Sequence, residues 1–277
     1  MTAADTLRSA VPTSPSSGIK TMARLGFAAI GVVYLLMGIL ALLAATGQSE
    51  GARADKEEAV QRVQDLPGGS ILLGLIAFGL LGYIIWRFTQ AIRDTESKGS
   101  DAKGVGKRIW YIISGLFYSG LALYAGRLAL NGSAQKSGDN ASQTLTAKVL
   151  SWPGGNWIIM LVGLIIIGVG FYQIYRAYSG RFQKDVNASS LPAGQQNLVY
   201  RAGQVGFTAR AVVLGITGYF FLQAGQQSRA GAVGSTGEAF DFLAAMGPLV
   251  LGIVAAGLVA YGFYMLVQAK YPVLRGI

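Results

Sequence analysis

Two arginines interrupt the long hydrophobic segments of this chain, and they are the residues best suited to a chemical role. Arg210 lies about a turn and a half into the segment 205–224, and Arg127 lies about one turn from the end of the segment 109–130. A charge at the centre of a bilayer costs about 2.5–3.5 kcal/mol on insertion scales. Each arginine therefore either binds a lipid phosphate, an anionic solute or a partner's carboxylate, or extends its guanidinium group to the headgroups.

Other basic and aromatic residues stand at the ends of hydrophobic segments. Arg24 and Arg108 are at segment starts, where basic residues usually anchor a membrane helix, and they are further candidates for contact with an anion or lipid. Trp86, Tyr172 and Tyr264 occupy equivalent positions near the ends of the second, fourth and sixth segments. This placement predicts a belt of aromatic residues at the membrane interface, and a stacking or ligand-cage role is the alternative.

The acidic residues limit the chemistry by their positions, because all 13 lie outside the hydrophobic segments. Transporters coupled to protons or cations usually place an acid at membrane depth. Histidine is absent, which removes histidine-bound haem, histidine-based metal sites and histidine acid–base catalysis. Asp55, Glu57 and Glu58 surround Lys56 and predict a solvated helix start rather than a Ca²⁺ site. With no phosphate-binding loop, dinucleotide fingerprint or Ser–His pair, we expect no enzyme activity, no cofactor and no metal.

The elements that hold these residues are apolar segments, in a chain of 277 residues that is 52% hydrophobic and 13% charged, with mean hydropathy +0.44. Each segment has about 20 residues, the length of a helix that crosses a ~30 Å hydrocarbon core. Backbone amides in lipid must bond within their own segment, so the sequence predicts an all-α membrane protein with six transmembrane helices. The predicted spans are residues 25–45, 71–92, 109–130, 157–178, 205–224 and 249–269.

The basic residues also predict the orientation. The amino-terminal tail, the linkers after the second and fourth segments and the carboxy terminus carry most of the 23 lysines and arginines. The positive-inside rule then places both termini in the cytoplasm, and we expect the bacterial inner membrane. Residues 1–20 lack apolar periodicity and predict a disordered cytoplasmic tail. The net charge of +10 follows mostly from this topology, and no basic soluble module is present to bind nucleic acid.

One two-helix unit is repeated three times, in residues 21–94, 105–180 and 199–271. Its second helix ends on an aromatic residue followed by a polar residue and alanine, in the forms Trp86-x3-Gln90-Ala91, Tyr172-x3-Arg176-Ala177 and Tyr264-x3-Gln268-Ala269. An even number of spans gives every repeat the same polarity, which predicts a pseudo-threefold axis along the membrane normal. Between its two helices each repeat carries a short amphipathic segment, predicted to lie along the membrane surface at residues 55–66, 143–152 and 237–246.

The repeats resemble a bacterial membrane family known as domain of unknown function 1206. The opening of the first repeat, Ala23-Arg24-Leu25-Gly26-Phe27-Ala28-Ala29-Ile30-Gly31-Val32-Val33-Tyr34, is similar to the family pattern ARxGYxARGVVY. The second repeat keeps Arg108, Gly115 and Tyr118, and the third keeps Gly206 and Arg210. The resemblance covers nearly the whole chain after residue 20. It implies an uncharacterised multi-pass membrane protein and brings no activity, cofactor or catalytic residue.

Two functions fit these observations best. The first is a non-enzymatic scaffold or accessory subunit, whose partners are membrane lipids and another membrane protein, with Arg210 at the contact. The alternative is a channel or transporter for an anionic solute or lipid, with Arg210 in the pathway. A lipid-modifying enzyme that uses polar residues of the outer loops is a third, weaker hypothesis.

Overall fold

A computed structural model describes residues 17–47, 56–65, 67–93, 102–132, 138–187, 191, 193–234 and 236–273. Most of the predicted tail and the acidic side chains of the 55–58 cluster fall outside the described residues. The prediction of six membrane helices is confirmed, because six helices are long and apolar enough to cross a membrane. They are α2 (Ser17–Ala45), α4 (Gly69–Arg93), α5 (Ala102–Asn131), α7 (Gly155–Tyr178), α8 (Ala193–Gln227) and α10 (Pro248–Lys270).

A short helix precedes the second long helix of each repeat, as predicted: α3 (Lys56–Gln64), α6 (Gly138–Leu150) and α9 (Thr236–Ala245). In α3, Ala59, Val60 and Val63 are fully buried, so its apolar face packs on the long helices. The turn that follows needs glycine twice. Gly68 has a φ of +76°, and a Cβ on Gly69 would collide with the carbonyl oxygen of Val63. Two 3₁₀ turns complete the described structure, η1 (Arg181–Asp185) and η3 (Ala230–Ala232).

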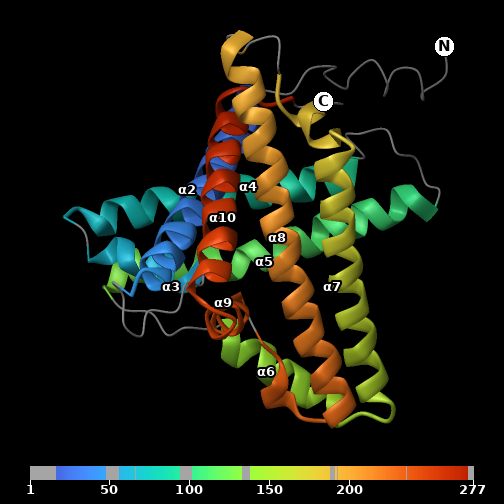
Figure 1. The fold of residues 1–277 in the computed structure, drawn as a ribbon. Coiled ribbons are helices and arrows are strands. Elements are labelled where there is room, and N and C mark those ends of the chain that lie inside the picture. Colours follow the sequence, from blue (N-terminus) through green and yellow to red (C-terminus); the bar gives the residue numbers. More distant parts are fainter. Residues whose placement is uncertain are drawn as a thin grey trace, which may run out of the picture.

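The long helices pack in a regular order between repeats. The second helix of each repeat lies on the first helix of the next, so α4 packs on α5, α7 on α8 and α10 on α2. Glycines allow the close approach that helix association in lipid relies on. Gly31 of α2 faces Gly262 of α10, and Gly163 of α7 faces Gly218 of α8. In Figure 1, α7 and α8 run up the view together whereas α4 and α5 run across it, so the six helices are not parallel.

Within the repeats the packing differs, because the first and third are closed hairpins and the second is open. Helices α2 and α4 pack together, as do α8 and α10, but α5 and α7 are not among the helix pairs in substantial contact in the described structure. Gly26 explains the closure of the first repeat, since a Cβ there would lie 2.6 Å from the Cβ of Tyr83. In the third repeat, a Cβ on Gly206 would likewise lie 2.6 Å from the Cα of Tyr261.

The second repeat carries bulky residues where the closed hairpins carry small ones. Counting from Arg24, Arg108 and Gln204, the position of Gly26 and Gly206 is Trp110 in the second repeat. A second close contact pairs Gly79 with Ala29 in the first repeat and Gly257 with Ala209 in the third. The equivalent residues of the second repeat are Ile165 and Ile113. These bulky side chains are exposed, by 44% for Trp110, 55% for Ile165 and 52% for Ile113. Large side chains prevent the backbone approach that closes the other two hairpins.

The predicted pseudo-threefold axis is not confirmed. The contacts between repeats recur three times, but the contact within a repeat is substantial only twice in the part of the chain that the structure describes. The six helices therefore form an open chain of contacts from α5 through α4, α2, α10 and α8 to α7.

Candidate functional site

Arg210 is the centre of a polar cluster between helices. Its Nη1 donates a hydrogen bond of 2.5 Å to the Tyr261 hydroxyl of α10. The guanidinium carbon lies 4.5 Å from the Tyr261 ring centroid and 5.2 Å from that of Tyr34 on α2, both within cation–π range. The two rings meet edge to face at 4.7 Å. Arg210 thus joins α8, α10 and α2, and its side chain remains partly exposed.

The local sequence explains why Arg210 reaches this position. Gly206 precedes Arg210 by one helical turn, so the two residues lie on the same face of α8. Because Gly206 has no side chain, α8 approaches the Tyr261 backbone closely. The arginine one turn later is then held beside the Tyr261 ring.

Arg87 of α4 makes a similar arrangement with other residues. Its Nε donates to the Tyr83 hydroxyl at 2.6 Å and its Nη1 donates to Gln90 Oε1 at 2.9 Å. The guanidinium lies 4.7 Å from the Tyr83 ring centroid and 5.2 Å from that of Tyr111 on α5. The Tyr83 ring meets Tyr118 of α5 edge to face at 5.0 Å. These contacts couple Arg87 to the α4–α5 interface.

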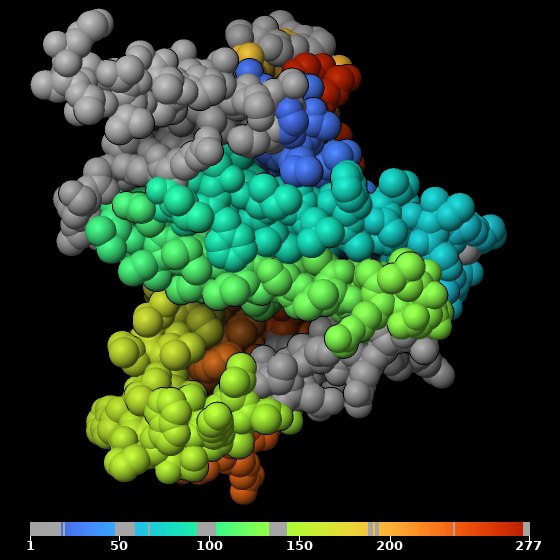
Figure 2. Space-filling view, turned by 180° about the vertical axis from the view of Figure 1, so that it is seen from behind, coloured from blue at the N-terminus to red at the C-terminus, as the bar shows by residue number. Residues whose placement is uncertain are grey.

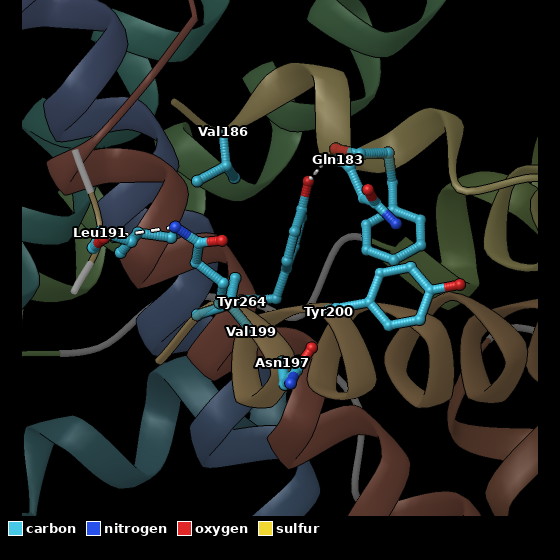
Figure 3. A pocket seen from close by; sticks show the side chains of 9 residues that line it. Gln183, Val186, Leu191, Asn197, Val199, Tyr200 and Tyr264 are labelled. Carbon is cyan, nitrogen blue, oxygen red and sulfur yellow. Dashed lines mark hydrogen bonds between the residues drawn. The ribbon is translucent and has the colours of Figure 1, made fainter. Parts of the chain in front are cut away.

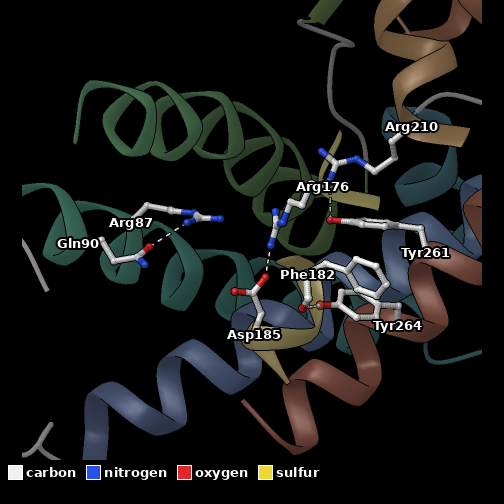
Figure 4. Close-up of polar contacts among 8 residues, drawn as sticks. All are labelled: Arg87, Gln90, Arg176, Phe182, Asp185, Arg210, Tyr261 and Tyr264. Carbon is white, nitrogen blue, oxygen red and sulfur yellow. Dashed lines mark hydrogen bonds and ion pairs between the residues drawn. The ribbon is translucent and has the colours of Figure 1, made fainter. Parts of the chain in front are cut away.

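Arg176 of α7 lies where the polar cluster meets the linker that follows α7. It forms an ion pair with Asp185 of η1, and it lies 4.6 Å from the Phe207 ring centroid of α8. The same turn inserts Phe182 into the core, where it is buried and its carbonyl oxygen accepts a 2.7 Å hydrogen bond from the Tyr264 hydroxyl. The linker therefore packs on α8 through Phe207 and on α10 through Tyr264, and Figure 4 shows Phe182 beside Tyr264.

The three arginines belong to one group, which we call the basic cluster: Arg87, Arg176 and Arg210 with Tyr34, Tyr83, Tyr118 and Tyr261. Tyr83 and Tyr118 lie near both Arg87 and Arg210. The Phe207 ring beneath Arg176 meets the Tyr261 ring at 5.3 Å. Figure 4 shows the three guanidinium groups turned toward the same interior region.

The charges of the basic cluster are unbalanced. Among the residues that the structure describes, Asp185 forms an ion pair with Arg176, and no carboxylate forms one with Arg87 or Arg210. A guanidinium group carries five N–H donors, and Arg210 uses one of them on Tyr261. Three positive charges with one carboxylate, at partly buried positions, form an environment suited to a phosphate or carboxylate ligand.

The other predicted arginines lie elsewhere. Arg108 donates from Nε to the carbonyl oxygen of Ala91 at 2.6 Å and from Nη2 to that of Ile92 at 3.4 Å. It therefore satisfies carbonyl groups at the carboxy-terminal end of α4, as basic residues often do. Arg24 and Arg127 have exposed side chains.

The three aromatic residues predicted to form a belt at the membrane interface differ in their exposure. Trp86 and Tyr264 are only 3% and 1% exposed, so they pack inside the protein, whereas Tyr172 is 49% exposed. The reason is the hairpin closure described above. Trp86 and Tyr264 belong to the closed repeats, and Tyr264 meets Phe207 across its hairpin at 5.5 Å. Tyr172 belongs to the open repeat.

The sequence distinguished Arg176 only as part of the repeat motif and did not distinguish Arg87 from the other basic residues at helix ends, so the interior role of both was missed. One signal was available for Arg87. Tyr83, Arg87 and Gln90 are spaced by four and three residues, which puts three polar groups on one face of an apolar helix. For Arg176 the partner Asp185 lies beyond the helix end, so helix periodicity does not reveal the pair.

A cavity of about 310 Å³ lies beside the basic cluster, beneath the linker that carries Phe182. Figure 3 shows Tyr200 and Tyr264 beside it, with polar amides at its edge. Its lining residues are Phe182, Gln183, Val186, Leu191, Gln196, Asn197, Val199, Tyr200 and Tyr264. No charged residue lines it, so it lacks the chemistry of the basic cluster.

Six apolar helices in tandem pairs, with a polar cluster between them, define a multi-pass helical membrane protein. The chain belongs to the family described as Domain of Unknown Function (DUF1206), which matches residues 25–94, 109–180 and 205–272. The three successive matches confirm the tandem repeat. The chain is similar to the uncharacterized protein YxxB of Bacillus subtilis (strain 168), at 32% identity over 255 residues and 91% of each chain. No solved structure matches it.

Proposed function

We propose that this protein is a non-enzymatic membrane protein that binds an anionic group in the basic cluster, as a carrier or channel for a lipid or solute. The observation that carries the proposal is the excess of guanidinium groups over carboxylates at Arg87, Arg176 and Arg210. Buried cations are costly unless they are paired, and an anionic ligand supplies the missing charge.

Tyrosine hydroxyls and ring faces support an arginine without neutralising it. Tyr261 accepts one hydrogen bond from Arg210, and Tyr34 and Tyr261 offer their ring faces. Such contacts hold the guanidinium group in place and leave its positive charge available. The basic cluster is therefore preorganised for a ligand that carries negative charge.

We also propose that the protein lies in the bacterial inner membrane with both termini in the cytoplasm. The positive-inside distribution of lysine and arginine supports this orientation. The start of α2 and the ends of α7 and α10 lie at the same end of the molecule in Figure 1. This orientation puts Arg176 and the linker after α7 on the cytoplasmic side.

The test is extraction into native lipid nanodiscs, followed by mass spectrometry of bound lipids, solutes and proteins. Wild-type protein is expected to retain an anionic species. Arg210→Gln should lower its occupancy roughly tenfold, because hydrogen bonds to charged groups contribute about 1.5–3 kcal/mol. The matched control is Arg127→Gln, which removes an exposed arginine of α5 and should retain the wild-type occupancy. Equal occupancy in the Arg210→Gln and wild-type proteins would contradict the proposal.

An accessory subunit is the second candidate, and the exposure of α7 favours it. Only 22% of its apolar window is buried, compared with 56% for α4, so a wide face of α7 is open to another membrane protein. The same experiment separates the two functions. Recovery of a stoichiometric protein partner, with no bound anion whose occupancy depends on Arg210, would favour the accessory-subunit function.

A further inference from the structure

The opening of the second repeat creates a recess in the side of the molecule. Figure 2 shows it between α5 (green) and α7 (yellow-green), with residues of the third repeat behind them in orange. In the first and third repeats the equivalent space is filled by the paired helices themselves. The recess therefore exists because Trp110, Ile113 and Ile165 replace the small residues of the closed hairpins.

The faces that border this recess are apolar. On α5, Trp110, Ile113 and Phe117 follow one another at helical spacing, and Phe117 is 62% exposed. Its equivalents, Val33 and Val213, are buried in the closed hairpins. Such a face suits hydrocarbon and offers no hydrogen bond to a small hydrophilic anion.

The polar face of the same helix reaches the basic cluster. Tyr111 lies against Arg87, and Tyr118 lies against Tyr83. Ser114 is within hydrogen-bond distance of the Tyr83 hydroxyl, at 3.3 Å. Each of these residues directly follows one of the apolar residues 110, 113 and 117. A molecule lying along α5 therefore touches apolar side chains on one side and approaches the arginines on the other.

The opposite approach to the basic cluster is covered by the linker after α7. Phe182 is buried against Phe207, Tyr200 and Tyr264. The ion pair between Arg176 and Asp185 ties the linker to α7. The lateral recess is thus the less obstructed approach in the part of the chain that the structure describes.

We infer that the recess between α5 and α7 admits an anionic phospholipid from the bilayer, with its phosphate at the basic cluster and its acyl chains on the apolar faces. This inference rests on the proposed function and names its ligand class. A phospholipid combines the two required chemistries, an anion for Arg87 and Arg210 and hydrocarbon for Trp110 and Phe117. Basic pockets between membrane helices on the cytoplasmic side are suited to anionic lipid headgroups.

Trp110 provides a direct probe. In the variant Trp152→Phe/Trp157→Phe, the remaining tryptophans are Trp110, which is exposed at the recess, and Trp86, which is buried and shielded from lipid. The protein is reconstituted in phosphatidylcholine vesicles that contain brominated phosphatidylglycerol or brominated phosphatidylcholine. Half-maximal quenching of Trp110 should need about tenfold less of the brominated phosphatidylglycerol.

Variants of the basic cluster test where the phosphate lies. Arg210→Gln should abolish the preference for phosphatidylglycerol, Arg210→Lys should keep part of it, and Arg127→Gln should keep all of it. The lysine variant is the control for misfolding, because it changes the same residue and retains the positive charge. A preference for phosphatidylglycerol that persists unchanged in Arg210→Gln would overturn the inference.

Other occupants give different results. Equal quenching by the two lipids, with inorganic phosphate bound by wild-type protein and lost in Arg210→Gln, would reject lipid access and keep the proposed function. Equal quenching with no anion bound at all would reject both. Disulfide formation between copies through Ile113→Cys, in a chain without native cysteine, would assign the recess to a second copy and overturn the inference.

Discussion

At the residue scale, Arg210 depends on partners from two other helices. The hydrogen bond from Nη1 to Tyr261 and the ring faces of Tyr34 and Tyr261 are its described contacts. Tyr261 belongs to the same repeat as Arg210, and Tyr34 belongs to the first repeat, so packing within the third repeat and packing between repeats together surround Arg210. The residue of the second repeat that corresponds to Arg210 is Ser114, whose hydroxyl lies 3.3 Å from the Tyr83 hydroxyl.

We expect Tyr261→Phe to weaken the hold on Arg210 while keeping the ring. The variant loses one hydrogen bond to a charged group, and polar contacts in membrane proteins typically contribute about 0.6 kcal/mol and at most about 1.7 kcal/mol. Unfolding in mixed detergent micelles measures the change in the free energy of unfolding. Tyr219→Phe on the exposed face of α8 is the matched control and should leave stability unchanged. Equal stability of the two variants would show that the hydroxyl contributes nothing.

At the element scale, glycine positions decide which helices pair. The contact of Gly206 with Tyr261 repeats that of Gly26 with Tyr83, and the rings of Phe207 and Tyr261 meet at 5.3 Å across the same hairpin. Helices in lipid gain little from hydrophobic contact, so a close fit between backbones provides most of their attraction. Trp110 removes that fit in the second repeat.

Gly206→Ala should destabilise the third repeat by about 1–3 kcal/mol, the usual cost of overpacking. The added Cβ would meet the Tyr261 backbone, which cannot move without displacing α10. Gly215→Ala is a control on the same helix, because nothing lies within 4 Å of its added Cβ. That control should be neutral or stabilising by up to about 1 kcal/mol, from helix propensity. Denaturant unfolding compares them, and equal effects would refute the role given to Gly206.

At the scale of the whole molecule, six helices make an open chain of contacts that begins at α5 and ends at α7. The short helices α6 and α9 lie toward one end in Figure 1, and the linker after α7 lies at the other. This separation is consistent with the proposed orientation, in which both termini lie in the cytoplasm. In the proposed orientation the basic cluster lies in the cytoplasmic half of the bilayer, where we propose that its arginines bind lipid phosphates.

The orientation is testable with single cysteines, since the chain has none of its own. Gln227→Cys at the end of α8 should react with a membrane-impermeant maleimide in intact cells. Ser179→Cys at the end of α7 should react only after permeabilisation. Both side chains are exposed in the structure, so a difference in their labelling reports the side of the membrane on which each residue lies. The reverse pattern would place the termini outside.

Much of the fold follows from local properties of the chain. The six helices and the three short helices were predicted because hydropathy, length and the need to satisfy backbone hydrogen bonds act within each segment. Arg210 was predicted as a candidate because a charge in an apolar segment is costly wherever its neighbours lie. These inferences need no knowledge of which helix touches which.

The interior roles of Arg87 and Arg176 and the opening of the second repeat depend on contacts between distant segments. Arg87 and Arg24 both look like boundary charges in the sequence, yet one lies in the basic cluster and the other is exposed. Trp86 and Tyr172 occupy equivalent positions, yet only the first is buried. The difference arises because burial is set by helix rotation and pairing, and these are set by the fit of small and bulky residues across two helices. Periodicity along one helix carries no information about that fit.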